Sequence, residues 1–184
     1  MKRKITILTM ALLAAMLLCN KALAASSGKC GDSITWTLDD NGNLTLTGSG
    51  KMYWETALSP FANNTEIKSV TIGDGITDMR WGAFEGCTNL TSVSIPESVT
   101  TIGVYTFSGC SSLTNITIPE SVTTIGERAF FSCTSLTNIT IPESVTTIGE
   151  RAFFSCTSLT NITIPESVTT IGERAFFSCT SLTN

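Results

Sequence analysis

The sequence predicts a repeat solenoid in which short β-strands stack coil upon coil, and three observations lead to this fold class. A 23-residue segment, NITIPESVTTIGERAFFSCTSLT, occupies residues 115–137 and recurs at 138–160 and 161–183. Apolar positions keep the same step through the earlier, less regular units. Every pattern inside a unit is only a few residues long. Repetition at such a period is typical of solenoids.

Apolar residues form columns at this period. The phenylalanine column is Phe61, Phe84, Phe107, Phe130, Phe153 and Phe176, and the cysteine column is Cys87, Cys110, Cys133, Cys156 and Cys179. One unit offers seven apolar positions: Val93, Ile95, Val99, Ile102, Phe107, Cys110 and Leu113. A lone unit cannot fold, because ordering its backbone costs more free energy than burying so few side chains provides. Stacking solves this, since each coil covers the apolar face of its neighbour.

The first element of each unit is a short strand. In NITIP, residues 115–119, polar and β-branched apolar residues alternate, so Ile116 and Ile118 face inward while Asn115 and Thr117 face outward. Pro119 ends the strand, because it lacks a backbone donor. These strands are expected to pair in parallel from coil to coil on one face of the solenoid.

The rest of the unit returns the chain to the next strand. SVTTIG directs Val122 and Ile125 inward, and ERAFFSC is predicted to be a short helical or 3-10 turn that brings Phe130 and Cys133 to the core. The predicted fold is therefore a coil with parallel strands on one face and short helical or 3-10 turns on the other.

A different pattern precedes the repeats. SITWTL and NLTLTG alternate around the turn sequence Asp39-Asp40-Asn41-Gly42, which predicts a β-hairpin. A terminal repeat needs a cap over its apolar end. We therefore predict an N-terminal hairpin cap over residues 25–60 and repeats over residues 61–184, in about six units with the last one incomplete.

The first residues are typical of a secretory signal peptide. A basic start, residues 1–4, precedes a short apolar run, residues 5–18, and small residues at Ala22 and Ala24 predict cleavage after Ala24. The apolar run is shorter than the ~20 residues that cross a bilayer. Lipidation at Cys19 is the less favoured alternative, because Leu18 precedes it where a small residue is required. We expect a secreted or cell-surface protein.

Charge and composition disfavour several classes of function. Without residues 1–24 the chain keeps seven basic and fifteen acidic residues, a net charge of −8, which disfavours a nucleic-acid partner. Histidine is absent, which removes the commonest general base and the commonest zinc ligand. No catalytic motif stands out. We expect no enzyme, no cofactor and no metal site.

The repeat resembles a known family. IPESVTTIGERAFFSCTSLTNIT is similar to the leucine-rich repeat of BspA-like bacterial surface proteins, with the pattern I-P-x-S-V-T-x-I-G-x-x-A-F-x-x-C-x-x-L, over about residues 61–184. Residues 30–53 resemble the leader that such proteins place before their repeats. The resemblance implies that ligands bind the strand face, which is usually concave in leucine-rich-repeat proteins.

Two surfaces are candidate binding sites. The first, called the strand face below, consists of the outward strand residues Ser92, Ser94, Asn115, Thr117, Asn138, Thr140, Asn161 and Thr163. The second is a possible aromatic patch of Phe131, Phe154 and Phe177, which align with Glu85 and Ser108, so the core does not demand an aromatic there. The alternative for these rings is packing along the flank of the coil.

Two further columns have simpler interpretations. The column cysteines are expected to be free buried thiols that serve as small apolar residues, although neighbouring coils come close enough for disulfides. Glu127-Arg128 recurs as Glu150-Arg151 and Glu173-Arg174, which predicts a solvated charged flank.

The predicted function is binding. We expect a cell-surface or secreted adhesin that contacts an extracellular protein or glycan and meets the membrane only through possible surface attachment. The alternatives are a passive structural spacer or a fragment of a larger surface protein and, less favoured, an ice-binding surface formed by the threonine and asparagine rows.

Overall fold

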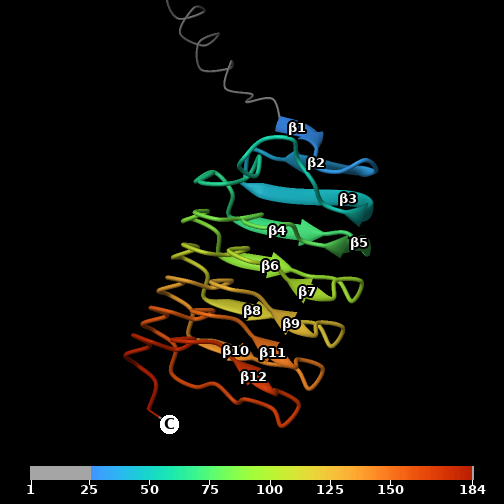
Figure 1. Ribbon diagram of the computed structural model, residues 1–184. Coiled ribbons are helices and arrows are strands. Elements are labelled where there is room, and N and C mark those ends of the chain that lie inside the picture. The colour runs from blue at the N-terminus through green and yellow to red at the C-terminus, as the bar shows by residue number, and fades with distance from the viewer. Residues whose placement is uncertain (1–25, 184) are drawn as a thin grey trace, which may run out of the picture.

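The computed structural model describes residues 26–183 and shows a β-solenoid whose coils stack along one axis below an N-terminal cap (Figure 1). The predicted fold class is therefore confirmed, apart from its helical turns. The signal peptide predicted for residues 1–24 lies outside the described residues. In residues 26–183 there is no helix long and apolar enough to cross a membrane.

The cap is a three-stranded antiparallel arrangement of β1 (Ser26–Lys29), β2 (Ile34–Leu38) and β3 (Asn43–Lys51). The hairpin of β2 and β3 is the predicted one, and Gly42 at its turn has a φ of 87°, which glycine adopts without strain. The Asp39 carboxylate accepts hydrogen bonds from the backbone amides of Asn41 and Asn43. Strand β1 was not expected from the sequence.

The first ladder of the solenoid continues from β3 through the predicted strands. Its members are β4 (Ser69–Ile72) and β6 (Ser92–Ser94), which continue the sheet of the cap, and β8 (Asn115–Thr117) and β10 (Asn138–Thr140), which pair with each other in the next two coils. Asn43 of β3 pairs in parallel with Ser69, Ser69 pairs with Ser92, and Asn115 pairs with Asn138. Equivalent residues of successive units therefore lie side by side.

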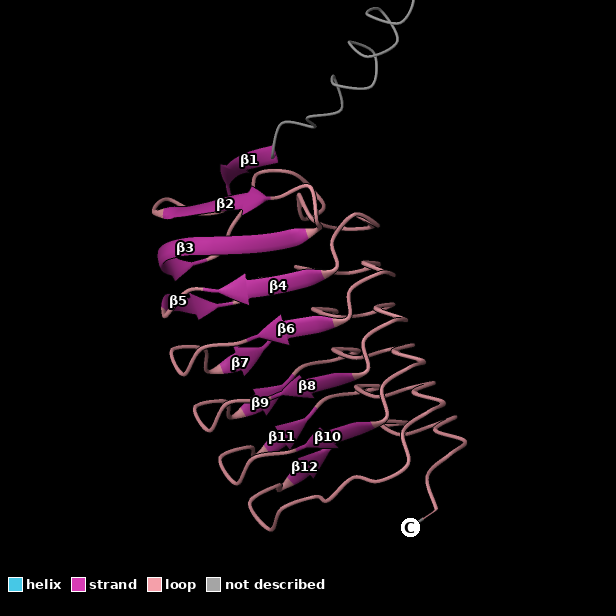
Figure 2. Cartoon of the chain, turned by 180° about the vertical axis from the view of Figure 1, so that it is seen from behind, coloured by secondary structure: helices cyan, strands magenta, loops and turns pink. Residues whose placement is uncertain are grey.

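A second parallel ladder follows the corner of each coil (Figure 2). It consists of β7 (Thr101–Ile102), β9 (Thr124–Ile125), β11 (Thr147–Ile148) and β12 (Thr170–Ile171). One coil earlier, β5 (Gly75–Asp78) occupies the same corner (Figure 2). The end of β3 pairs with β5, so one long cap strand pairs with both strands of the first coil, β4 and β5. The sequence did not reveal the second ladder, because two-residue strands are too short to show alternation.

On the third side of each coil, the predicted helical or 3-10 turns are not found. Residues 26–183 contain no helix, and this side is a series of turns. In one unit the amides alternate between two kinds of partner. Ala129, Phe131 and Cys133 donate to the carbonyl three residues earlier at 3.1–3.3 Å, whereas Arg128, Phe130 and Ser132 donate to Glu150, Ala152 and Phe154 of the next coil at 2.8–2.9 Å.

Left-handed residues cause this alternation. Arg128 and Ser132 have φ values of 50° and 56°, and a helix requires negative φ at every residue. The next unit repeats the conformation at Arg151 and Ser155. Each turn thereby directs alternate amides to the neighbouring coil, which satisfies buried backbone donors without a helix.

The core is a stack of identical side chains from successive coils. The rings of Phe61, Phe84, Phe107, Phe130, Phe153 and Phe176 lie 5.2–5.7 Å from their neighbours and within 19° of parallel. Ile116, Ile118, Val122 and Ile125 are buried, as predicted. The repetition of sequence thus lets each apolar side chain pack on its own copy.

Candidate functional site

The strand face consists of side chains that point away from the core. All eight of its residues are exposed, while the isoleucines between them, Ile116 and Ile139, are buried. Alternation along the strand produces this separation, because successive side chains point to opposite sides of a sheet. The structure therefore places the predicted residues on the outward side of the first ladder.

The parallel register aligns these residues in two rows along the solenoid axis, called files below. The first file is Ser92, Asn115, Asn138 and Asn161, and the second is Ser94, Thr117, Thr140 and Thr163. Asn115 pairs with Asn138, and an isolated bridge joins Asn138 to Asn161. In the second file Thr117 pairs with Thr140. Neighbouring members of a file are about 4.8 Å apart, the spacing of paired strands. The strand face is thus a regular array of uncharged amides and hydroxyls, which can donate and accept hydrogen bonds.

Strand β4 extends both files, and Asn43 of the cap extends the first file further; none of these residues was predicted from the sequence. Ser69 pairs with Ser92, and its hydroxyl donates to the Asn43 side-chain oxygen at 2.7 Å. Thr71 pairs with Ser94. A 23-residue step backward from Ser92 and Ser94 gives Ser69 and Thr71, so the period could have found these two residues. Asn43 pairs with a residue 26 positions later and required the structure.

The possible aromatic patch forms a second stack outside the core. Phe131 and Phe154 lie 5.0 Å apart at 9° between their rings, and Phe154 and Phe177 lie 5.3 Å apart. Phe131 and Phe154 are half-buried, whereas Phe177 is 57% exposed. Stacking covers much of each inner ring, so the inner rings present edges more than faces to solvent.

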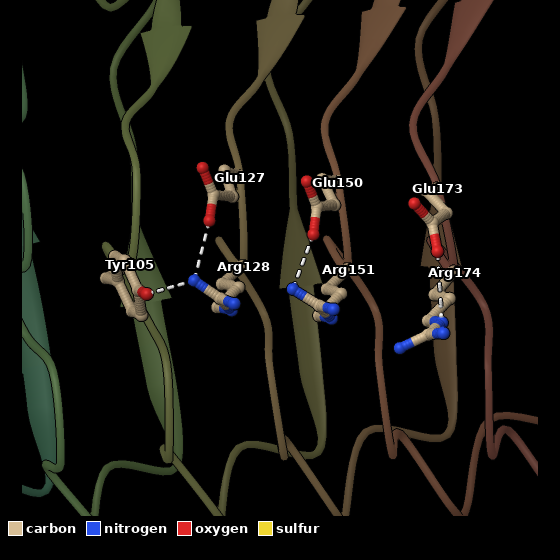
Figure 3. Close-up of polar contacts among 7 residues, drawn as sticks. All are labelled: Tyr105, Glu127, Arg128, Glu150, Arg151, Glu173 and Arg174. Carbon is tan, nitrogen blue, oxygen red and sulfur yellow. Dashed lines mark hydrogen bonds and ion pairs between the residues drawn. The ribbon is translucent and has the colours of Figure 1, made fainter.

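The charged flank pairs each arginine with its own neighbour (Figure 3). Arg128 lies 2.6 Å from Glu127, Arg174 lies 3.2 Å from Glu173, and Arg151 pairs likewise with Glu150. Arg128 also donates to the Tyr105 hydroxyl and lies over its ring at 5.3 Å. Exposed pairs of this kind contribute about 0–1 kcal/mol each. The opposite charges are neutralised locally, so this flank is no basic patch.

The column cysteines are buried free thiols, as is Cys30 of the cap. Each column thiol donates to a backbone carbonyl of the preceding coil, as Cys110 does to Phe84 at 3.2 Å. Burial raises the pKa of Cys87 and Cys133 to about 12. Among residues 26–183 no group of three or more His, Cys, Asp or Glu side chains is arranged to hold a metal ion.

Comparison with known families then decides what kind of repeat this is. The profile of the BspA type leucine rich repeat region matches residues 57–183 in six copies. The chain belongs to the BspA-type leucine-rich-repeat family. The BspA-type repeats thus include every residue of the strand face and of the aromatic patch. A comparison with curated proteins finds no match.

Solved structures resemble these BspA-type repeats. A leucine-rich repeat protein from Bacteroides ovatus is 29% identical, with a TM-score of 0.65, over 83% of this chain and 45% of that protein. A leucine rich cell surface protein from Faecalibacterium prausnitzii is 30% identical, with a TM-score of 0.62, over 88% and 54% of the two chains. A Treponema pallidum leucine-rich repeat protein, 23% identical with a TM-score of 0.59 over 85% and 92%, shares the fold. This chain spans about half the length of the first and second of these proteins.

Proposed function

We propose that this BspA-type repeat protein is a secreted or cell-surface adhesin that binds an extracellular protein or glycan through its strand face. The observation that supports the proposal is the exposed, in-register array of amides and hydroxyls on the first ladder. Its work is contact with a macromolecule rather than catalysis, in keeping with a repeat family and a histidine-free composition.

Two observations support the location. The Faecalibacterium prausnitzii protein that resembles this chain is described as a cell surface protein. The sequence of residues 1–24 predicts export with cleavage after Ala24. An exported adhesin meets its ligand outside the cell, so extracellular proteins and glycans are the partners to test.

The geometry favours an extended ligand. Members of each file repeat about every 4.8 Å, so a ligand that lies along the solenoid axis meets the same amide or hydroxyl in every coil. Each neutral hydrogen bond contributes only about 0.5–1.5 kcal/mol, so useful affinity requires several coils together. Adding or removing identical units would then adjust affinity without changing the contact chemistry.

The test replaces Asn138, Thr140, Asn161 and Thr163 with lysine in the exported chain. A matched control carries four lysines directly before the strands of the second ladder, at the exposed positions Thr100, Thr123, Thr146 and Thr169. Circular dichroism first verifies that both variants are folded. Binding to immobilised extracellular-matrix proteins, glycans and whole cells is then measured. We expect the strand-face variant to lose binding by at least about tenfold and the control to retain it.

Other outcomes select other functions. If both variants bind as tightly as the unchanged chain, the strand face is not the site, and the aromatic patch of Phe131, Phe154 and Phe177 becomes the next candidate. Binding by none of the three chains would favour the passive structural spacer, for which the identity of three successive units is the supporting observation. Ice-binding is tested in the same samples by thermal hysteresis, which the strand-face lysines would abolish.

A further inference from the structure

A cleft of about 500 Å³ opens in the cap, outside the identical repeats and away from the strand-face residues. Its lining includes Lys29, Asp32, Tyr53, Trp54 and Glu55. We propose that this cleft is a second binding site and that it takes a short neutral oligosaccharide. The proposal does not depend on a ligand for the strand face.

Two chain segments form the cleft, and backbone hydrogen bonds hold them together. The Tyr53 amide donates to the Cys30 carbonyl at 2.8 Å, which joins the segment after β3 to the turn after β1. The adjacent Met52 amide donates to the Asp78 carbonyl at 3.1 Å, which joins the same segment to β5. These bonds position the lining residues before any ligand arrives, and pre-organisation reduces the entropic cost of binding.

Trp54 is fixed as part of the wall. Its side chain is 8% exposed, and the Arg80 guanidinium lies over its ring at 5.3 Å. Arg80 also donates to the Trp54 carbonyl oxygen at 3.2 Å. These two contacts with Arg80 hold the indole in place, which keeps the wall of the cleft rigid. Tyr53 beside it is 40% exposed and offers a ring to a ligand.

The lining matches the chemistry of a sugar ring. A pyranose has an apolar C–H face, which stacks on an aromatic ring such as Tyr53, and a rim of hydroxyls. The exposed carboxylates of Asp32 and Glu55 accept hydrogen bonds from hydroxyls, and the Lys29 ammonium donates them. A purely apolar ligand would bury these charges without partners, which is costly. The sugar is therefore a better fit than a hydrocarbon.

The charge and the size of the cleft narrow the range of suitable ligands further. The lining holds two carboxylates and one ammonium, and the Arg80 guanidinium lies over Trp54, so the charges around the cleft balance and give an anionic sugar no net attraction. The volume lies in the range of about 300–1,000 Å³ that is usual for small-ligand sites. All three tryptophans and both tyrosines of the chain lie within residues 36–105, before the identical units. Tryptophan and tyrosine, amphipathic aromatic residues that suit a wet binding site, are thus confined to the part of the chain before the identical units.

The experiment titrates the exported chain with free short oligosaccharides of glucose, xylose, mannose and N-acetylglucosamine, and with a uronic-acid oligosaccharide as the anionic probe. Isothermal titration calorimetry reports affinity, and tryptophan fluorescence, to which Trp54 contributes, supplies a second signal. We expect at least one neutral oligosaccharide to bind. Tyr53→Ala should weaken it by about tenfold or more, and Tyr53→Phe should retain most of the affinity because the ring remains.

Two further variants complete the test. Glu55→Gln should weaken binding severalfold, because a neutral amide accepts hydrogen bonds less strongly than a carboxylate. Trp81→Ala is the matched control, since Trp81 is 44% exposed but does not line the cleft, and it should bind the sugar unchanged. Circular dichroism establishes that each variant is folded, and Tyr53→Phe supplies a conservative substitution should Tyr53→Ala unfold.

Three results would overturn the proposal. They are no binding of any neutral oligosaccharide, equal affinity in Tyr53→Ala and the unchanged chain, or preference for the uronic-acid probe. Capture of an extracellular protein that Tyr53→Ala abolishes, without sugar binding, would reassign the cleft to a protein. Free sugars compared between the unchanged chain and Tyr53→Ala test the cleft, whereas the four-lysine variant tests the strand face, so either proposal can fail without the other.

Discussion

The thiol of Cys133 donates a 3.1 Å hydrogen bond to the backbone carbonyl of Phe107, which lies one coil earlier. The same contact joins Cys156 to Phe130 and Cys179 to Phe153. The sequence suggested only a small apolar side chain at this column. The structure shows that the thiol also connects adjacent coils.

Alkaline pH should destabilise the solenoid through these thiols. Burial raises the pKa of Cys133 from 9.0 to about 12, so the folded state holds this proton more tightly than the unfolded state. The stabilisation is complete below the unfolded pKa and is lost as pH rises from about 9 towards 12. We expect Cys133→Ala to reduce the slope of unfolding free energy against pH in this window by about 1.4 kcal/mol per pH unit. Urea unfolding at several pH values measures it, and identical slopes in the two chains would contradict the prediction.

The left-handed serines should limit stability. Ser132 and Ser155 have φ values of 56° and 59°, whereas the equivalent positions in earlier units are Gly86 and Gly109. Left-handed geometry costs a residue with a Cβ about 1–2 kcal/mol, and the extra freedom of glycine in the unfolded chain offsets about half of this. The double variant Ser132→Gly, Ser155→Gly should gain about 1 kcal/mol in urea unfolding. Ser135→Gly, at a residue without positive φ, is the control and should lose stability instead.

The two stacks of phenylalanine should differ in their contribution. Phe130 is fully buried between Phe107 and Phe153, so Phe130→Ala should cost about 3–5 kcal/mol through the cavity it leaves. Phe131 is half-buried, and Phe131→Ala should cost about 1 kcal/mol because less area leaves water. Chemical denaturation of both variants gives the comparison. Similar losses would mean that the outer stack is as structural as the core and would weaken its candidacy as a binding patch.

The hairpin turn of the cap should loosen in acid. The Asn43 backbone amide, followed by the Asn43 side chain, donates to the Asp39 carboxylate and lowers the pKa of that group below 3.8. A lowered pKa contributes stability above the unfolded value, and this contribution disappears as pH falls through the folded value. The stability difference between the unchanged chain and Asp39→Asn should therefore shrink below about pH 4. NMR titration of Asp39 checks the direction directly, and a midpoint at or above the ordinary value would refute it.

The patterns that held in the structure are those that depend on single short segments. The 23-residue step placed the phenylalanine stack correctly, and alternation in NITIP placed Ile116 inside and Asn115 outside. The turn sequence before Asn43 placed the hairpin. Each follows from side-chain burial along one strand or one turn, which periodicity expresses directly.

The prediction of a helical turn was wrong, because hydrogen bonds between neighbouring coils determine the conformation of this segment. ERAFFSC has helix-compatible residues, but Arg128 and Ser132 are left-handed, and alternate amides bond to the next coil. Gly82, Gly86 and Gly109 at the equivalent positions were the available signal, since all three have positive φ. Glycine, which adopts positive φ without strain, occupies these positions in the early units. In the later units arginine and serine replace it, and the stacking of coils holds them in the same conformation.

By itself the sequence determined the solenoid, its period, the side chains that enter the core and the outward files of the strand face. Repetition determines these, because every coil must bury the same positions against its neighbour. Only the tertiary structure decided where the backbone amides of the turns donate, how the cap extends the first file through Asn43, and that Asp32 and Tyr53 line one cleft. Those features join residues of different coils or separate segments, whose distance in space no local pattern encodes.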